Sequence, residues 1–219
     1  MKALFGLALV VLIGGCVRDV SEPGTQTSPV RGTISLPISE EEELNFVELE
    51  ATGLFISEDT SRLTGWIVNP TNSSVAFASA AFRWNGSEGT DEVSVFSISD
   101  IILPHERSPF LARIPRDFPP NAVRHARGEI SSADTHRFVI TINERTDSDF
   151  ATNVSGSVRG DRAAENVRVW VAATDAEDHV LDVSSATIDR IAAGGEGHFT
   201  IRLRPMEQAT RIEAGASSP

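Results

Sequence analysis

The clearest pattern along the chain is a two-residue alternation of apolar and polar positions, which is typical of β-strands with one buried face. The segments that alternate, or that are apolar over the length of a strand, are 75–84, 93–96, 138–143, 167–171 and 199–204. Clusters rich in Asn, Pro, Gly and Ser separate them, at 69–72, 85–87 and 193–197. Such clusters form turns. Short strands with frequent turns predict an all-β chain built from small antiparallel β-sandwiches.

Three landmarks occur twice along the chain in the same order. The pairs are Phe46-Val47 with Phe138-Val139, 63–67 with 154–158, and 110–114 with 199–203. Because the offsets of 92, 91 and 89 residues differ so little, we infer two copies of one domain. The expected organisation is a sandwich at 44–115, a connection at 116–136, a second sandwich at 137–205 and a tail at 206–219. We predict one short helix within the connection, at 122–130.

Gly65 and Gly156 occupy matching positions inside two predicted strands. A glycine inside a strand is costly unless a bulge or a close neighbour needs the space of the missing side chain. We therefore predict that each glycine faces a packed aromatic ring or a strand crossing, and that neither contacts a ligand. The candidate rings are Phe46 or Phe77 for Gly65, and Phe138 or Phe199 for Gly156.

Residues 1–15 have the order of an export signal. Lys2 supplies the positive charge, residues 3–13 are an apolar run, and Gly14 with Gly15 provides the small residues that precede a cleavage site. Eleven residues at ~1.5 Å each make about 17 Å of helix, far short of the ~30 Å hydrocarbon core of a bilayer. The segment is therefore predicted to be a signal peptide and not a membrane span.

Ile13-Gly14-Gly15-Cys16 resembles the lipobox of bacterial lipoproteins. The resemblance implies a diacylglycerol on Cys16, which would become the first residue of the mature chain, and it makes a membrane the first expected partner. Val17 stands where aspartate would signal retention in the inner membrane, which favours the outer membrane of the cell envelope. The alternative is a plain secretory signal with an incidental cysteine. The polar residues 16–43 are expected to form a flexible tether, because they are rich in Pro, Gly, Ser and Thr and show no apolar period.

Charge and cysteine content exclude several classes of protein. Nineteen basic against 31 acidic residues give a net charge of −12, which argues against nucleic acid as a partner. The same charge repels anionic headgroups, so membrane attachment is expected through the lipid on Cys16. A single cysteine excludes an intrachain disulfide and a cysteine-based metal cluster.

The two copies resemble the FxLYD family, immunoglobulin-like sandwiches often found on bacterial lipoproteins. The resemblance rests on Gly-x-Ile at Gly65 and Gly-x-Val at Gly156, on a strand ending near 175–177, and on a glycine-rich turn before Phe199. It covers 63–114 and 154–203. The Phe-x-Leu-Tyr-Asp signature itself is absent, and 171–175 reads Val-Ala-Ala-Thr-Asp at its place. The resemblance implies an extracytoplasmic binding or spacer module without known chemistry.

The chain contains no recognisable catalytic motif, so we assign no catalytic residue, metal ligand or cofactor. The five histidines form neither an HxH nor an HExxH pair, and no Gly-x-Ser-x-Gly is present. His105 and His198 are placed in equivalent turns before the last strand of each copy, either as a shared ligand site or as ordinary exposed histidines. Acidic groups at 147–149 and 175–178 are candidates for calcium, or ordinary acidic hairpin tips.

Two tryptophans are the candidates for a contact surface. We expect one of Trp66 and Trp170 to belong to a sandwich core and the other to point outward, where it would mark a partner surface. The favoured function is a non-enzymatic lipoprotein that binds or scaffolds a protein partner in the cell envelope. The alternatives are a passive structural spacer and a metal-dependent extracytoplasmic enzyme.

Overall fold

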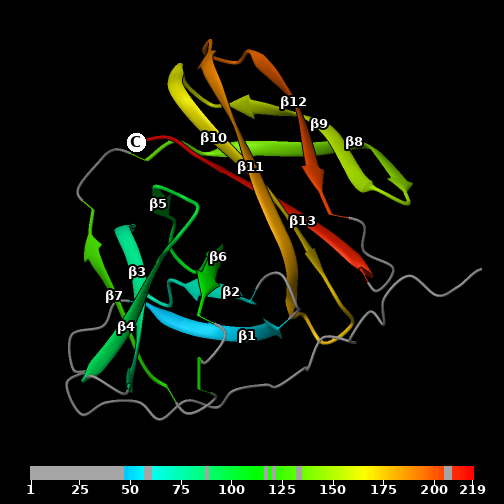
Figure 1. Cartoon of the computed structure of the whole chain (residues 1–219). Helices are drawn as coiled ribbons and strands as arrows, with labels where there is room; N and C mark the ends of the chain where they lie inside the picture. Colours follow the sequence, from blue (N-terminus) through cyan, green and yellow to red (C-terminus); the bar gives the residue numbers. More distant parts are fainter. Residues whose placement is uncertain are drawn as a thin grey trace, which may run out of the picture.

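A computed structural model describes residues 47–56, 61–86, 89–115, 118–119, 122–131, 135–204 and 209–219. Within these residues the chain forms thirteen β-strands and no helix (Figure 1). None of the described segments is a helix that is long and apolar enough to span a membrane. The signal peptide, Cys16 and the tether fall outside the described residues.

The first half of the chain, called copy 1 here, folds into two facing sheets. One sheet has the order β1 (Glu48–Ile56), β2 (Ser61–Val68), β6 (Arg107–Ile114). The other is built on β3 (Val75–Asn85), with β4 (Thr90–Phe96) and β5 (Ile101–Ile102) on one path and β7 (Val123–Ile130) also paired to β3. All these pairings are antiparallel. Leu63, Phe82 and Phe110 are among the fully buried side chains between the sheets.

The second half, copy 2, repeats this arrangement. One sheet has the order β8 (Phe138–Ser148), β9 (Ala151–Gly160), β12 (Glu196–Leu203), and the other has β11 (Val180–Ile191), β10 (Ala164–Thr174), β13 (Arg211–Ser217). Val158, Val169 and Phe199 belong to the core between them. The protein is thus an all-β chain of two tandem antiparallel β-sandwiches whose strand orders match, except that copy 1 also contains the short strand β5.

The helix predicted at 122–130 is wrong, because this segment is strand β7. Its backbone pairs with β3 from Val75↔Ile130 to Arg83↔Val123, and Ala126 is buried in the core of copy 1. The long central strand β3 needs hydrogen-bond partners on both edges, and this tertiary demand overrides the helix propensity of the segment.

The expected tail contains strand β13, which pairs with β10 from Arg168↔Ser217 to Thr174↔Arg211. Each sandwich therefore takes its last strand from beyond the bounds expected at 115 and 205. The division into two sandwiches that fold independently stays a prediction.

The prediction that both in-strand glycines face an aromatic ring is confirmed. A Cβ on Gly156 would lie 2.6 Å from Phe199 Cζ, and a Cβ on Gly65 would lie 2.9 Å from Phe110 Cζ. In both copies the ring comes from the residue directly opposite the glycine on the neighbouring strand. Phe199 was a candidate, whereas the ring over Gly65 is neither of its two candidates: Phe77 is 75% exposed, and Phe46 lies outside the described residues.

We predict that Gly156→Val lowers the free energy of unfolding by about 1–3 kcal/mol through overpacking. The new side chain has no room, because a Cβ there would also lie 2.3 Å from the backbone oxygen of Thr141. Urea unfolding of the whole chain measures the effect. Ser155→Val, at a half-buried position one residue earlier, is the control, because it also introduces a valine into β9. An unchanged midpoint for Gly156→Val would contradict the packing argument.

Candidate functional site

The two sandwiches share a buried contact, which we call the joint. Its apolar centre consists of Trp66, Trp170, Ala172, Val180 and Val183, with Val68, Ile98 and Leu111 packed against it. The rings of Trp66 and Trp170 meet edge to face, with centroids 5.9 Å apart and planes inclined by 61°. Trp66 comes from copy 1 and Trp170 from copy 2, and both are at least 95% buried. The joint is therefore a third small core that joins the two sandwiches.

Strand alternation explains how β2 and β10 supply the joint. In β2, Leu63 and Ile67 face the core of copy 1, so Trp66 faces the opposite side. In β10, Val169 and Val171 face the core of copy 2, so Trp170 faces the joint. The expectation that one tryptophan belongs to a sandwich core is wrong. Each tryptophan points outward from its own sandwich and covers the other.

Hydrogen bonds fix the orientation of both indoles in the joint. Trp66 Nε1 donates to the backbone oxygen of Asp178 at 3.2 Å, and Trp170 Nε1 donates to Ser99 Oγ at 2.9 Å. Thr64 Oγ1 adds a donation to the oxygen of Val180 at 2.5 Å. All three bonds cross from one copy to the other. Buried donors that lack a partner are costly, so these bonds select one relative placement of the sandwiches.

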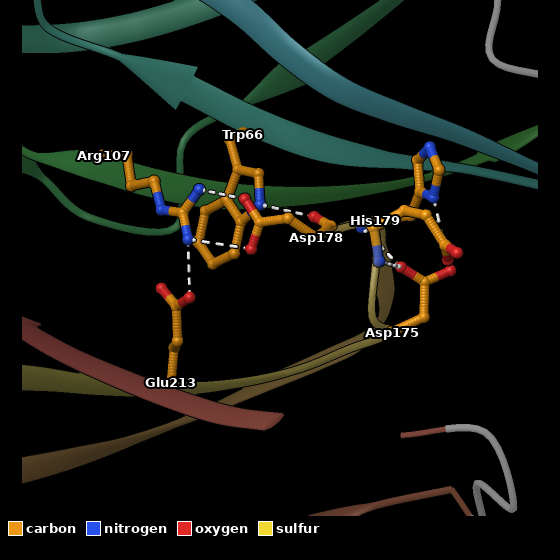
Figure 2. A network of polar contacts seen from close by, with 7 residues as sticks. Trp66, Arg107, Asp175, Asp178, His179 and Glu213 are labelled. Carbon is orange, nitrogen blue, oxygen red and sulfur yellow. Dashed lines mark hydrogen bonds and ion pairs between the residues drawn. The ribbon is translucent and has the colours of Figure 1, made fainter. Parts of the chain in front are cut away.

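Arg107 closes one end of the joint (Figure 2). Its guanidinium carbon lies 4.0 Å from the centroid of the Trp66 ring. Arg107 Nη1 donates to Asp178 Oδ2 at 2.5 Å, and Nη2 donates to Asp178 Oδ1 at 3.1 Å and to Glu213 Oε1 at 2.5 Å. Burial acts against the charge of Arg107, but the hydrogen bonds to the two carboxylates outweigh it and raise the pKa of Arg107. One cation of copy 1 thus holds two carboxylates of copy 2.

Asp182 lies at another part of the contact, between two arginines of different copies. Its Oδ1 is 3.8 Å from both Arg62 Nη1 and Arg204 Nη2, and its Oδ2 accepts the backbone N–H of Arg204 at 2.9 Å. Asp182 as a whole is only 4% exposed. Burial raises the pKa of Asp182 to about 6, against the lowering effect of Arg62. Burial likewise lowers the pKa of Arg62, and Arg113 adds to this effect.

The turn between β10 and β11 contains the only group of possible metal ligands among the described residues, Asp175, Glu177 and His179. One ligand atom from each lies within 4.8 Å of the others. Asp175 Oδ1 accepts the backbone N–H groups of Glu177 and His179 at 3.0 and 2.9 Å, and Oδ2 lies 3.3 Å from His179 Nδ1. Asp178, which belonged to the expected calcium group, binds Arg107 instead. The hydrogen bonds of Asp175 shape the turn that carries Asp178 and Val180 into the joint.

The acidic hairpin at 147–149 is also held by protein groups. Asp147 accepts a hydrogen bond from Thr152 Oγ1 at 2.6 Å and one from Arg145 Nε at 3.1 Å. These two bonds lower the pKa of Asp147, the bond from Thr152 most. No calcium ligand set is assembled there by the described side chains.

The two singled-out histidines do not occupy equivalent positions, which corrects the expectation from the sequence. His105 has a positive φ of 61° in the turn before β6, with its Nε2 2.9 Å from Asn72 Oδ1. His198 lies inside β12, opposite Ser157. The position that matches His105 is Gly194, 89 residues later, which has a φ of 67°.

Sequence reasoning missed Arg107, Asp182 and Ser99. Long-range ion pairs leave no local pattern, so nothing in the sequence linked Arg107 to Asp178. A usable signal existed for the joint itself: residues 169–173 are all apolar, which is typical of a strand buried on both faces.

Comparisons with known proteins add little to this picture. No family model and no curated protein matches the chain. Among solved structures, the chain is similar to one described as a tetra-tandem repeat in the extending region of a large adhesion protein. The identity is 14%, the TM-score is 0.22, and the match covers 78% of this chain and 48% of that one. The chain thus spans about half the length of that neighbour, and the fold described above stands on its own strand pairing.

We predict that Arg107→Gln lowers the free energy of unfolding by about 1–2 kcal/mol, because Asp178 and Glu213 lose their shared cation and Trp66 loses the charge above its ring. Urea unfolding measures the change. Arg83→Gln is the matched control, since Arg83 pairs with Glu92 inside copy 1 at an exposed position. Its effect should stay below about 1 kcal/mol. Equal losses for the two variants would contradict a special role of Arg107.

A further prediction concerns the pH dependence of Asp182. The folded pKa of about 6 lies above the ordinary value of 3.8, so between these values the folded chain keeps a proton that the unfolded chain has released. The free energy of unfolding should therefore fall as the pH rises from about 4 to 6, by at most about 3 kcal/mol, and stay level above. Asp182→Asn should remove this slope.

Urea unfolding at a series of pH values tests the Asp182 slope. Asp189→Asn is the charge-matched control, at an exposed position of the same strand, and should keep the slope of the parent protein. A slope that Asp182→Asn leaves unchanged would show that another group causes it.

Proposed function

We propose that the protein is a non-enzymatic lipoprotein of the bacterial cell envelope, anchored in the outer membrane by a lipid on Cys16. Its two immunoglobulin-like sandwiches would present one fixed surface to a protein partner of the envelope. The observation that carries the proposal is the joint. Burial of Trp66 against Trp170, with cross-copy hydrogen bonds to both, holds the sandwiches at one angle. A binding or scaffold module gains from such pre-organisation, because less ordering is needed when the partner binds.

The sequence supports the location. Ile13-Gly14-Gly15-Cys16 fits a lipobox, and the resemblance to FxLYD domains fits a module carried by lipoproteins. The net charge of −12 leaves the lipid as the means of attachment to a bilayer. A passive spacer would share the rigid joint, so the two functions differ in whether a discrete partner contacts the sandwiches.

We predict that Cys16→Ser releases the protein from membranes or leaves it unprocessed. Two or more acyl chains anchor a protein stably, whereas the polar tether offers no other anchor. Partition of cell extracts into the detergent-rich phase, compared between the parent protein and the variant, measures the effect. Val17→Asp is a second variant, and it should shift the lipoprotein toward the inner-membrane fraction in an enteric host. Equal partitioning of the parent protein and Cys16→Ser would contradict the anchor.

Binding is tested separately from anchoring. Chemical crosslinking in intact cells of the source organism should yield one or a few discrete products that contain this protein. Trp170→Ala, which opens the joint, should weaken those products while Cys16 is still acylated. A binding module predicts this loss, whereas a spacer predicts no discrete product with either protein.

A further inference from the structure

Two phenylalanines of copy 1 are strongly exposed and lie in one cavity. Phe77 is 75% exposed and Phe96 is 65% exposed. Both line a cavity of about 430 Å³. Soluble proteins bury most of their large aromatic side chains, so two exposed rings in one hollow need an explanation.

The backbone of Phe77 gives a reason to connect this hollow with function. Phe77 has a φ of 51°, a left-handed conformation that is strained for a bulky side chain. Asn166 has a φ of 52° in copy 2 and lies 89 residues later, the same offset that separates Phe110 from Phe199. Asparagine adopts this conformation at little cost. Copy 2 thus carries a residue that tolerates this backbone at the equivalent position, whereas copy 1 carries a strained, exposed phenylalanine.

The bulge in β3 exposes the ring. The pairing of β3 with β7 shifts register between Ala76 and Ser79, so Phe77 falls inside the irregularity. Bulges redirect side chains and are common beside binding sites. Ser79 is paired with Phe96 on the other neighbour, β4, which brings the second ring to the same part of the sheet.

The polar groups around the cavity are already engaged. Arg168 Nη1 lies 3.2 Å from Asp100 Oδ1 and donates to the oxygen of Ile98 at 3.2 Å. Ser97 Oγ donates to the oxygen of Ser99 at 2.8 Å, and Ser99 Oγ accepts the indole N–H of Trp170. With these groups satisfied, the cavity offers mainly apolar surface, from the two rings together with Ala76, Ala78 and Ile101. An apolar group is therefore the ligand that fits it.

The cavity is continuous with the joint. Ser99 and Asp100 come from copy 1, whereas Arg168 and Pro219 come from copy 2, and the C-terminus lies at the boundary between the copies (Figure 1). Asp100 also donates its backbone N–H to Ser217 Oγ at 3.0 Å. The hollow thus has its full shape only when the joint holds the two sandwiches together.

We propose that this cavity is the docking site of a partner protein, which inserts an aliphatic or aromatic side chain between Phe77 and Phe96 and surrounds it with basic residues. The inference rests on the proposed binding function and names its surface. The basic character follows from charge complementarity with the whole chain, whose net charge is −12. At the rim itself Glu129 and Arg127 are both exposed, and Asp100 pairs with Arg168. The net charge of the chain also disfavours a second copy and anionic headgroups as occupants.

The test uses the whole chain and three fluorescein-labelled decapeptides as probes. The first carries Phe-Leu flanked by lysines, the second replaces Phe-Leu by Ser-Ser, and the third replaces the lysines by glutamates. Fluorescence anisotropy should show binding of the first peptide and at least tenfold weaker binding of the other two. Phe77→Asn and Phe96→Ser should each weaken the first peptide at least tenfold. Phe150→Ser, which removes an 80% exposed ring from copy 2, is the matched control and should change nothing.

Phe77→Asn also separates a docking role from a structural one. Because asparagine relieves the strain that copy 2 avoids, the thermal midpoint should rise while binding is lost. A lower midpoint would overturn the proposal, and so would a first peptide that fails to bind or binds all variants alike. Self-association that Phe77→Asn abolishes in sedimentation would identify a second copy as the occupant and overturn it too. If envelope crosslinks survive in Phe77→Asn, this surface is wrong while the proposed binding function stands.

Discussion

The structure depends on one constraint, the burial of Trp66 of copy 1 against Trp170 of copy 2. Each tryptophan sits on a strand whose other face already packs in a sandwich core, so β2 and β10 are buried on both sides. The sequence Thr64-Gly65-Trp66 shows how one strand serves both. Gly65 makes room for Phe110 in the core, and its two neighbours point to the joint and hydrogen-bond to copy 2. A change at any of these three positions therefore affects a sandwich and the joint together.

The two copies have matching strand orders, apart from β5, but have diverged where they meet other surfaces. The residue after Gly65 is Trp66, and the residue after Gly156 is Ser157, which is buried and hydrogen-bonds to Glu196. At position 157 copy 2 thus carries a small polar side chain where copy 1 carries the indole of Trp66. Each copy carries a tryptophan toward the other, Trp66 in copy 1 and Trp170 in copy 2, and copy 1 also carries Phe77 toward solvent. The repeat is a shared scaffold with different faces, and the functional differences lie at equivalent positions.

Much of the fold could be predicted from the sequence, because strand alternation and the repeated landmarks are local patterns. The same patterns placed an aromatic ring over each glycine, and the pairing of Phe110 with Phe199 in the repeat already pointed to the correct ring for Gly65. Strands β7 and β13 were missed, since their structure is set by the unpaired edges of β3 and β10 rather than by their own residues. The joint was missed for a different reason. The alternation of side chains along a strand shows which face of the strand lies outside the sandwich core, but it does not show what covers that face. Asp178 was noticed for its charge, but its partner Arg107 is 71 residues away and only the fold brings them together.

The joint has an apolar centre and charged ends. The apolar centre contributes stability, and the charged ends determine the angle between the copies. Buried ion pairs add little net stability because desolvation offsets much of the attraction, so the tryptophans and their neighbours hold the copies together. Arg107 and Asp182 act on the angle between the copies, because each forms an ion pair with the other copy and any other placement would leave a charge poorly solvated. A fixed angle in turn gives the Phe77 cavity its second wall. By linkage, a partner that binds that cavity must also stabilise the joint. A change that weakens the joint would then also weaken binding of the partner to the Phe77 cavity. The contact of Trp66 with Trp170, on which the fold depends, is in this way connected with the surface proposed for function.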